Sequence, residues 1–248
     1  MNKRIVLFVT VALVALAALP AVGQAEITPT PAPSKTPTAA PAVSTAESVA
    51  SGQLEPLTQE DLSIITGNVQ RPNGIAWYNG YLYTACTGDG TVYEINDTDG
   101  QTRTYIYGIR NAQTLYVEQD ASSNVVLWVP DYQANALTRV TRSGVQTVVR
   151  NLQGPWGIAF VDEERFLLTN LLGNTINVLT RDGDNEVVME GLSSPMGLVH
   201  NGQTVYVANY GSTRRSIEWY PLDDVLAGTA DPSAEGHVLV SGLQNTTG

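Results

Sequence analysis

Cysteine and lysine are scarce in this sequence. Cys86 is the only cysteine among 248 residues, so a disulfide within the chain is excluded. The two lysines, Lys3 and Lys35, both lie near the N-terminus. The chain carries 24 acidic against 13 basic residues, and its net charge is −11. Because such a surface repels phosphate backbones, we expect neither nucleic acid nor an anionic membrane surface as a partner.

Motifs of common catalytic sites are also missing. The sequence has no Gly-x-Ser-x-Gly motif and no zinc-type spacing of Cys and His. We expect its two histidines, His200 and His237, to pack or to lie at the surface rather than to act as general bases. Cys86 has no base beside it in the sequence, so we do not expect it to be a nucleophile. A helical pattern is found only at residues 221–228.

The N-terminal region has the features of an export signal and a tether. Lys3 and Arg4 precede an apolar run at residues 5–19, and small residues lead up to Ala25. This pattern predicts a signal peptide at residues 1–25. The apolar run is shorter than the roughly 20 residues of a membrane-spanning helix, so we expect no permanent span after cleavage. Residues 26–53 are rich in Pro, Thr and Ala and are typical of a linker. We therefore expect a secreted or periplasmic protein.

The folded region repeats one pattern. Three stretches align on the glycine that follows Pro-x, namely Gly74, Gly157 and Gly197, and Thr114 takes the same position in a degenerate copy. These four positions are 40 to 43 residues apart, and residue 241 begins another copy. The three clearest copies read "PNGIAWYNGYLYTACTGDG", "PWGIAFVDEERFLLTNLLG" and "PMGLVHNGQTVYVANYG".

Each repeat divides into four short runs of alternating apolar and polar residues. In the third repeat these runs are residues 157–161, 165–170, 175–180 and 186–190. Such runs are typical of β-strands, and four of them in about 40 residues predict one propeller blade. We expect an all-β fold at residues 54–248: a β-propeller of four-stranded antiparallel blades, with four blades and the start of a fifth. A two-sheet sandwich would not explain the internal copying.

The repeats resemble those of a known superfamily. Pro-x-Gly-[Ile/Leu], followed by an apolar strand that ends in Ala-Asn or Thr-Asn, is similar to the NHL-repeat and gluconolactonase (regucalcin-like) propellers, with streptogramin lyase in the same neighbourhood. The resemblance implies an intact ring that is six-bladed, or seven-bladed. It also implies that these 248 residues are a C-terminally truncated fragment, the alternative being a small closed ring of four or five blades.

Candidate binding residues lie on one rim of the expected propeller. In a four-stranded antiparallel blade, the connection from the preceding blade and the loop between strands two and three emerge at the same edge. Asp131, Asn170 and Asn209 each follow an apolar strand directly, which predicts oxygen ligands for a divalent cation such as calcium, or instead side-chain-to-backbone turns. The full set of candidates is Asn73, Asp131, Tyr132, Trp156, Asn170, Met196, Asn209 and Tyr210.

Two functions are compatible with this rim. One is an exported binding or scaffold protein that recognises a protein, peptide, glycan or small molecule there. The alternative, which the resemblance implies, is a metal-dependent sugar-lactone hydrolase or a streptogramin-lyase-like enzyme. In the lactonases a Glu early in the first repeat holds the metal together with Asn and Asp from later blades. This chain has Asn73 near that point and no Glu, whereas Asn170 and Asn209 match in type. Catalysis therefore stays open.

Overall fold

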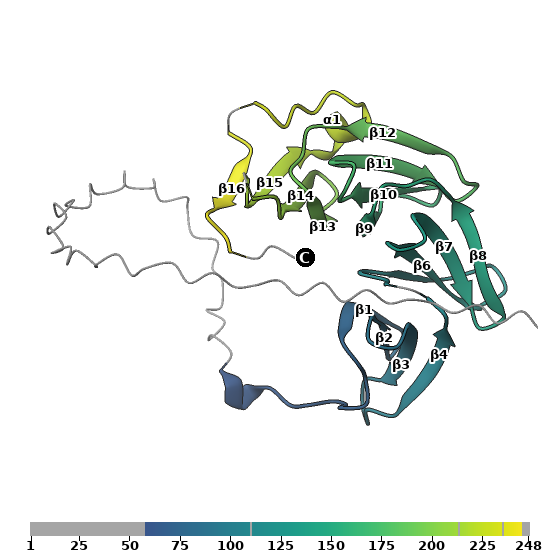
Figure 1. The fold of residues 1–248 in the computed structure, drawn as a ribbon. Coiled ribbons are helices and arrows are strands. Elements are labelled where there is room, and N and C mark those ends of the chain that lie inside the picture. The colour runs from purple at the N-terminus through teal and green to yellow at the C-terminus, as the bar shows by residue number, and fades with distance from the viewer. Residues whose placement is uncertain (1–57, 110, 213, 235, 245–248) are drawn as a thin grey trace, which may run out of the picture. The chain divides into compact units, whose positions relative to one another are not determined.

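The computed structural model describes residues 58–109, 111–212, 214–234 and 236–244. The predicted signal peptide and linker lie outside these residues, as do residues 245–248 of the expected start of a fifth blade. The described residues form four antiparallel four-stranded sheets, arranged as propeller blades (Figure 1). The predicted all-β propeller fold is therefore confirmed for this part of the chain.

The strand order in every blade follows the chain, with the first strand innermost and the fourth outermost (Figure 1). The first two blades comprise β1 (Pro72–Tyr78), β2 (Tyr81–Cys86), β3 (Thr91–Asn96), β4 (Thr102–Tyr107), β5 (Tyr116–Gln119), β6 (Val125–Asp131), β7 (Ala136–Thr141) and β8 (Gly144–Val149). The last two comprise β9 (Pro155–Phe160), β10 (Arg165–Asn170), β11 (Thr175–Thr180), β12 (Asn185–Met189), β13 (Pro195–His200), β14 (Thr204–Asn209), β15 (Ser216–Pro221) and β16 (Val238–Ser241).

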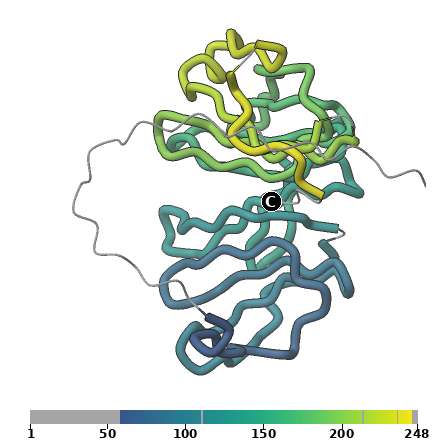
Figure 2. Tube along the Cα trace, turned by 90° about the vertical axis from the view of Figure 1, so that its left-hand side faces the viewer, coloured from purple at the N-terminus to yellow at the C-terminus, as the bar shows by residue number. Residues whose placement is uncertain are grey.

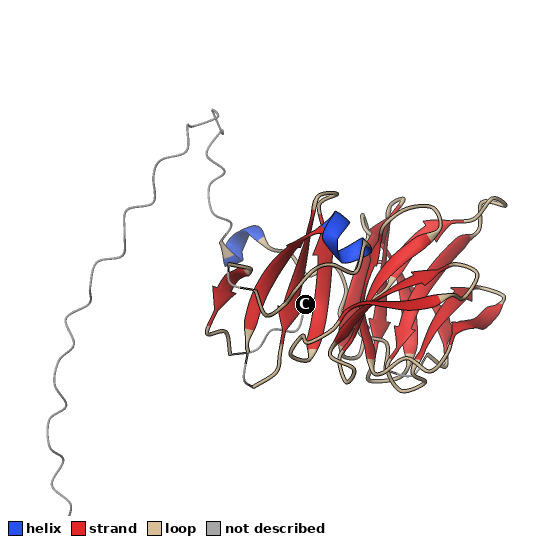
Figure 3. Ribbon diagram, turned by 90° about the horizontal axis from the view of Figure 1, so that it is seen from above, coloured by secondary structure: helices blue, strands red, loops and turns tan. Residues whose placement is uncertain are grey.

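Two short helices interrupt this pattern. A 3-10 helix, η1, spans Gln59–Asp61, and α1 spans Leu222–Leu226 between β15 and β16. The position of α1 confirms the helical pattern at residues 221–228. Figure 3 shows the strands running between two edges that carry loops, with α1 at one of them. Neither helix of the described residues has the length and apolar character that crossing a membrane requires.

The apolar core lies between neighbouring blades rather than within one sheet. Because side chains alternate across a strand, Phe166 and Leu168 of β10 pack towards the second blade, and Leu167 packs towards the fourth. All three are fully buried. The Cα trace in Figure 2 shows the blades following one another in chain order. The alternating sequence therefore buries both faces of a blade between its neighbours.

Glycine permits the innermost strands to approach closely. A Cβ atom at Gly157 would lie 2.4 Å from the carbonyl oxygen of Met196 in the next blade. One at Gly74 would lie 2.6 Å from the Cα atom of Thr114. Side chains at these two positions would therefore force neighbouring blades apart. The glycine of the Pro-x-Gly repeat therefore has a packing role at the hub.

Arginine–glutamate pairs join the blades away from the hub. Arg142 in the second blade contacts Glu94 in the first, with Nη2 2.6 Å from Oε2. Arg181 in the third blade contacts Glu118 in the second through both guanidinium Nη atoms. Its guanidinium also lies over the ring of Phe166, 4.7 Å from the centroid. Each pair fixes the turn between strands three and four of one blade to the preceding blade.

A third glutamate forms a network inside the fourth blade. Glu218 of β15 is fully buried. It accepts hydrogen bonds from Arg214 Nε at 2.5 Å, from Ser216 Oγ at 2.6 Å and from Tyr220 Oη at 2.6 Å. Burial by itself raises the pKa of Glu218, but these hydrogen bonds and the Arg214 charge outweigh it, and the pKa lies below its ordinary value. The carboxylate therefore stays charged in the folded blade.

Candidate functional site

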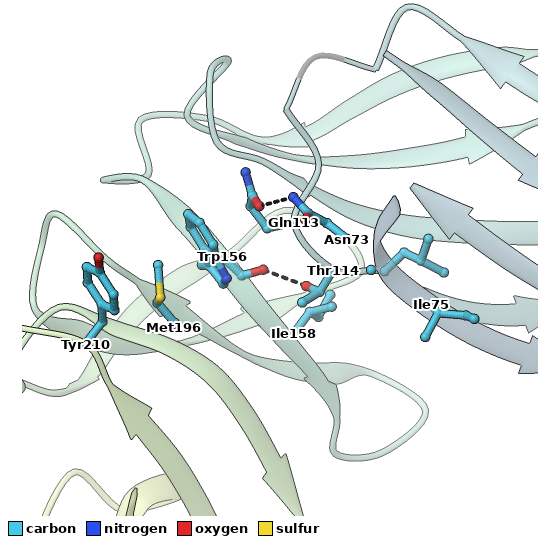
Figure 4. A pocket seen from close by; sticks show the side chains of 10 residues that line it. Asn73, Ile75, Gln113, Thr114, Trp156, Ile158, Met196 and Tyr210 are labelled. Atoms are coloured by element: carbon cyan, nitrogen blue, oxygen red, sulfur yellow. Dashed lines mark hydrogen bonds between the residues drawn. The ribbon is translucent and has the colours of Figure 1, made fainter. Parts of the chain in front are cut away.

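A cavity of about 730 Å³ lies at the hub, where the innermost strands of all four blades converge (Figure 4). Its walls come from β1, the residues before β5, β9 and β13, together with one residue that follows β14. Four of the eight predicted rim residues line it. The described residues that line it are Asn73, Gly74, Ile75, Gln113, Thr114, Leu115, Trp156, Ile158, Met196 and Tyr210.

Each connection between blades contains one residue in the left-handed backbone conformation, just before the chain enters the hub. In every blade the residue just before the position aligned with Pro72 has a positive φ, between 49° and 65°. The chain there is held by backbone hydrogen bonds to the loop after the second strand, as in Leu171 N–H to Gly154 O at 2.9 Å. Connections and second-to-third-strand loops therefore share one edge, as predicted. The four left-handed residues are Arg71, Asn111, Gly154 and Ser194.

An amide chain lines one side of the cavity. Asn73 Nδ2 donates to Gln113 Oε1 at 2.7 Å, and Gln113 Nε2 donates to Asn111 Oδ1 at 2.7 Å. Gln113 is buried, whereas Asn73 is exposed. Both hydrogen-bonding ends of the Gln113 amide are thus engaged within the protein. The side-chain oxygen of Asn73, Oδ1, has no hydrogen-bond partner among the described residues and is available to a ligand.

Trp156 is held in place from two directions. The hydroxyl of Thr114 donates to the Trp156 carbonyl oxygen at 2.5 Å (Figure 4). Tyr132 lies edge-on to the indole, with ring centroids 5.8 Å apart and an interplanar angle of 84°. Tyr132, a predicted site residue, therefore supports Trp156 rather than lining the cavity itself. The indole Nε1–H has no hydrogen-bond partner within the described part of the chain.

Met196 and Tyr210 continue the wall next to Trp156. Figure 4 shows Tyr210, Met196 and Trp156 side by side along the cavity. The backbone N–H of Tyr210 donates to Ser194 O at 3.1 Å, which fixes the loop after β14. The guanidinium of Arg215 lies over the Tyr210 ring, 5.5 Å from its centroid. The Tyr210 hydroxyl has no partner in the described residues.

The three predicted oxygen ligands are the last residues of β6, β10 and β14, and none of them lines the cavity. Asp131, Asn170 and Asn209 are all buried, at 6%, 3% and 0% exposure. Their Oδ1 atoms accept backbone N–H bonds from residues 134, 153 and 193, at 2.9, 3.1 and 3.1 Å respectively. These contacts are those of turn and connection residues. Of the two alternatives predicted for these residues, the contacts fit side-chain-to-backbone turns, and calcium ligation stays the second alternative.

The cavity lining is neutral. None of the ten residues carries a formal charge at neutral pH. Within the described residues, no group of three or more His, Cys, Asp or Glu side chains is placed to hold a metal ion. Asparagine and glutamine amides, a phenol and an indole therefore supply the polar chemistry of the site. Such groups bind and orient a ligand, but none of them is a strong base or a good nucleophile at neutral pH.

The two histidines and the cysteine are engaged in hydrogen bonds, ring stacking or burial within the fold. His200 Nδ1 accepts from Gly202 N–H at 3.1 Å, so its Nε2–H donates to the carbonyl oxygen of Phe160. His237 stacks on Tyr220 with ring centroids 4.7 Å apart. Burial raises the pKa of the Cys86 thiol, which disfavours the thiolate. None of the three lines the cavity.

Gln113 and Thr114 were not among the predicted site residues. Their signal in the sequence was Thr114 itself, which replaces the glycine found in the other copies. A side chain at this crowded position must find a partner, and here it bonds to the neighbouring connection. The residue before it then faces the hub as well. Thr114, the one departure from glycine among the four copies, therefore indicated the site more clearly than the shared Pro-x-Gly pattern did.

Comparison with known proteins bears on the fold. No family model and none of the curated proteins matches the sequence. The chain is similar to the virginiamycin B lyase structure from Staphylococcus aureus, with 22% identity, a TM-score of 0.47, and coverage of 61% of this chain and 55% of the lyase. It is also similar to a chain of the nidogen/laminin complex, with 17% identity, a TM-score of 0.48, and coverage of 64% and 61%.

The described residues are assigned to the β-propeller fold by their own four blades of four antiparallel strands. The match spans little more than half the length of the lyase. At these identities the likeness is one of fold, and the activity of this propeller has to be argued from its own cavity.

Proposed function

We propose that this protein is an exported binding protein that holds a small ligand in the hub cavity of its propeller. The observation that carries the proposal is the cavity itself, to which all four blades contribute. Its volume of about 730 Å³ falls in the range of small-molecule sites, which is roughly 300–1,000 Å³. Its walls combine apolar side chains with a few polar groups, which is the usual composition of such sites.

The composition of the lining favours binding over hydrolysis. A hydrolase needs a base, a nucleophile or a metal-bound water next to the reacting bond. The lining offers Asn73, Gln113, Thr114, Trp156 and Tyr210 as its hydrogen-bonding side chains. These groups can orient a ligand without activating water. Recognition is therefore the function that we assign to this rim.

The N-terminal sequence supports export. The basic residues, apolar run and small residues before Ala25 are those of a signal peptide, and the Pro/Thr/Ala-rich stretch behind them would tether the propeller outside the cytoplasm. The full chain is expressed in a bacterial host, and the exported protein is sequenced from its N-terminus. We expect a mature chain that begins at Glu26. Cytoplasmic retention with residues 1–25 intact would contradict export.

Ligand binding is tested by saturation-transfer NMR on the full chain. The panel contains oligosaccharides, linear and cyclic peptides, and sugar lactones. We expect at least one class to receive saturation from wild-type protein and to lose it with Trp156→Ala. Trp77→Ala is the matched control, because Trp77 is 63% exposed, bonds to Asp97 in the turn between β3 and β4, and does not line the cavity. Transfer that is absent for every class, or that survives Trp156→Ala, would contradict the proposal. Opening of a lactone in the same spectra would establish the hydrolase alternative.

A further inference from the structure

The hub cavity has the chemistry of a site for an uncharged sugar. We infer that its ligand is a short neutral oligosaccharide, one of whose pyranose rings lies against Trp156. This inference rests on the proposed ligand site and names the class of ligand. Three properties of the lining carry it: the absence of charge, the aromatic wall, and the unengaged polar atoms around that wall.

The absence of charge selects against ionic ligands. The chain has a net charge of −11, yet none of the described residues that line the cavity is charged. An ionic group that enters the cavity loses part of its hydration and gains no counter-charge from a lining side chain, since the Arg215 guanidinium lies over the Tyr210 ring and is not itself part of the lining. A ligand that carries a carboxylate, a phosphate or an ammonium group at its point of contact would therefore bind poorly.

The aromatic wall suits the C–H face of a sugar ring. Trp156 and Tyr210 flank the polarisable side chain of Met196 along one side of the cavity (Figure 4). Aromatic faces are electron-rich and attract weakly positive C–H groups. Tyr132 packs against the indole in a T-shaped contact, which restricts the orientation of the ring. A pyranose ring offers the flat C–H face that such a wall accommodates.

The unengaged polar atoms suit hydroxyl groups. The Asn73 carbonyl oxygen is an acceptor, the Trp156 Nε1–H is a donor, and the Tyr210 hydroxyl is both. None of the three has a partner in the described residues. Hydroxyl groups donate and accept, so a sugar can satisfy all three atoms at once. A peptide offers a fixed alternation of amide N–H and carbonyl groups and fewer flat C–H faces, so we favour the sugar.

The inference is tested by titrating the full chain with cellotriose, maltotriose and chitotriose, followed by tryptophan fluorescence. The charged counterparts are the galacturonic acid and glucosamine trimers. We expect at least one neutral trisaccharide to bind with a Kd of about 1 mM or lower. The Kd of the charged trimers should be higher by about tenfold or more. Asn73→Ala should weaken binding severalfold, Trp156→Ala should abolish it, and Trp156→Phe should retain part of it. Trp77→Ala should leave the Kd unchanged.

The outcomes separate this inference from the proposed function. Equal binding of neutral and charged trimers would overturn the selectivity for a neutral sugar. Binding that Asn73→Ala and Trp156→Phe leave unchanged would overturn the sugar site at Trp156. Saturation transfer to peptides alone, lost with Trp156→Ala, would overturn the sugar class and preserve the proposed function. The absence of any binding in both experiments would overturn both. Asn73 is exposed, so Asn73→Ala reports on the site even where Trp156→Ala disturbs folding.

Discussion

The contact between Arg181 and Glu118 provides a quantitative test of how the blades are held together. Arg181→Met removes the guanidinium and keeps an apolar side chain over the aromatic rings. In the structure Arg181 Nη2 lies 2.7 Å from Glu118 Oε2, and the guanidinium lies 5.3 Å from the Trp128 ring centroid. Trp128 Nε1 also donates to Glu118, at 2.8 Å. The substitution therefore leaves one carboxylate at a blade interface with a single indole partner.

The expected loss follows from burial. The side chains of Arg181 and Glu118 are 24% and 20% exposed, so the pair lies between a surface pair and a buried one. Charge-assisted hydrogen bonds contribute about 1.5–3 kcal/mol, and a cation–π contact contributes about 0.5–2 kcal/mol. Since methionine restores part of the packing, we expect a loss of about 2–3 kcal/mol. For a domain of this size that lowers Tm by about 5–10 °C.

Arg165→Met is the matched control. Arg165 bonds to Asp162 at 2.7 Å within one hairpin, and both side chains are 40% exposed. Exposed pairs of this kind contribute at most about 1 kcal/mol. Urea unfolding and calorimetry of both variants make the comparison. The reasoning would be refuted by equal losses in the two variants, or by a loss below about 1 kcal/mol for Arg181→Met.

Three further predictions concern other parts of the fold. The pKa of Glu218 is depressed in the folded state, so its charge stabilises the protein above the unfolded-state pKa of about 4.3, and this stabilisation is lost as the pH falls through the folded value. Glu218→Gln should therefore unfold in less urea than wild type at pH 7, and the difference in urea midpoint should narrow below about pH 4. A difference that does not depend on pH would contradict this. Gly157→Ala should destabilise the propeller by about 1–3 kcal/mol, because its Cβ atom would meet the Met196 carbonyl oxygen. Gly67 has open space around it, so Gly67→Ala should leave stability unchanged. Equal losses of unfolding free energy in the two variants would contradict the close approach at the hub. Calcium should leave Tm unchanged, since the Oδ1 atoms of Asn170 and Asn209 accept backbone N–H bonds; a rise in Tm that the double alanine variant removes would instead establish the calcium site.

Most of the fold could be predicted because local pattern and tertiary packing agree. Residues 165–170 and 175–180 were expected as strands, and β10 and β11 span these residues. The innermost strand β9 begins at Pro155, before the expected residue 157. Its pairing with β10 shifts between Leu168 and Asn170, so the proline still lies opposite the end of its neighbour. That irregularity depends on how the chain turns into the hub, which periodicity does not encode.

The candidate site was predictable only in part. Asn73, Trp156, Met196 and Tyr210 line the cavity, because the repeats predicted which edge of each blade carries the connections. Whether a side chain there faces the hub or the backbone depends on the left-handed residue before each innermost strand, such as Ser194. The position of a residue after a strand could not distinguish a turn residue such as Asn170 from a cavity residue.

Fluorine NMR of the full chain labelled with 5-fluorotryptophan tests the hub site most directly. The chain has four tryptophans, and loss of one signal in Trp156→Phe assigns the resonance of Trp156. Titration with the neutral trisaccharides is predicted to shift that resonance in a saturable manner and to leave the resonance of exposed Trp77 in place. A Trp156 resonance that stays fixed while another tryptophan moves, or a spectrum that no trisaccharide changes, would contradict sugar binding at the hub.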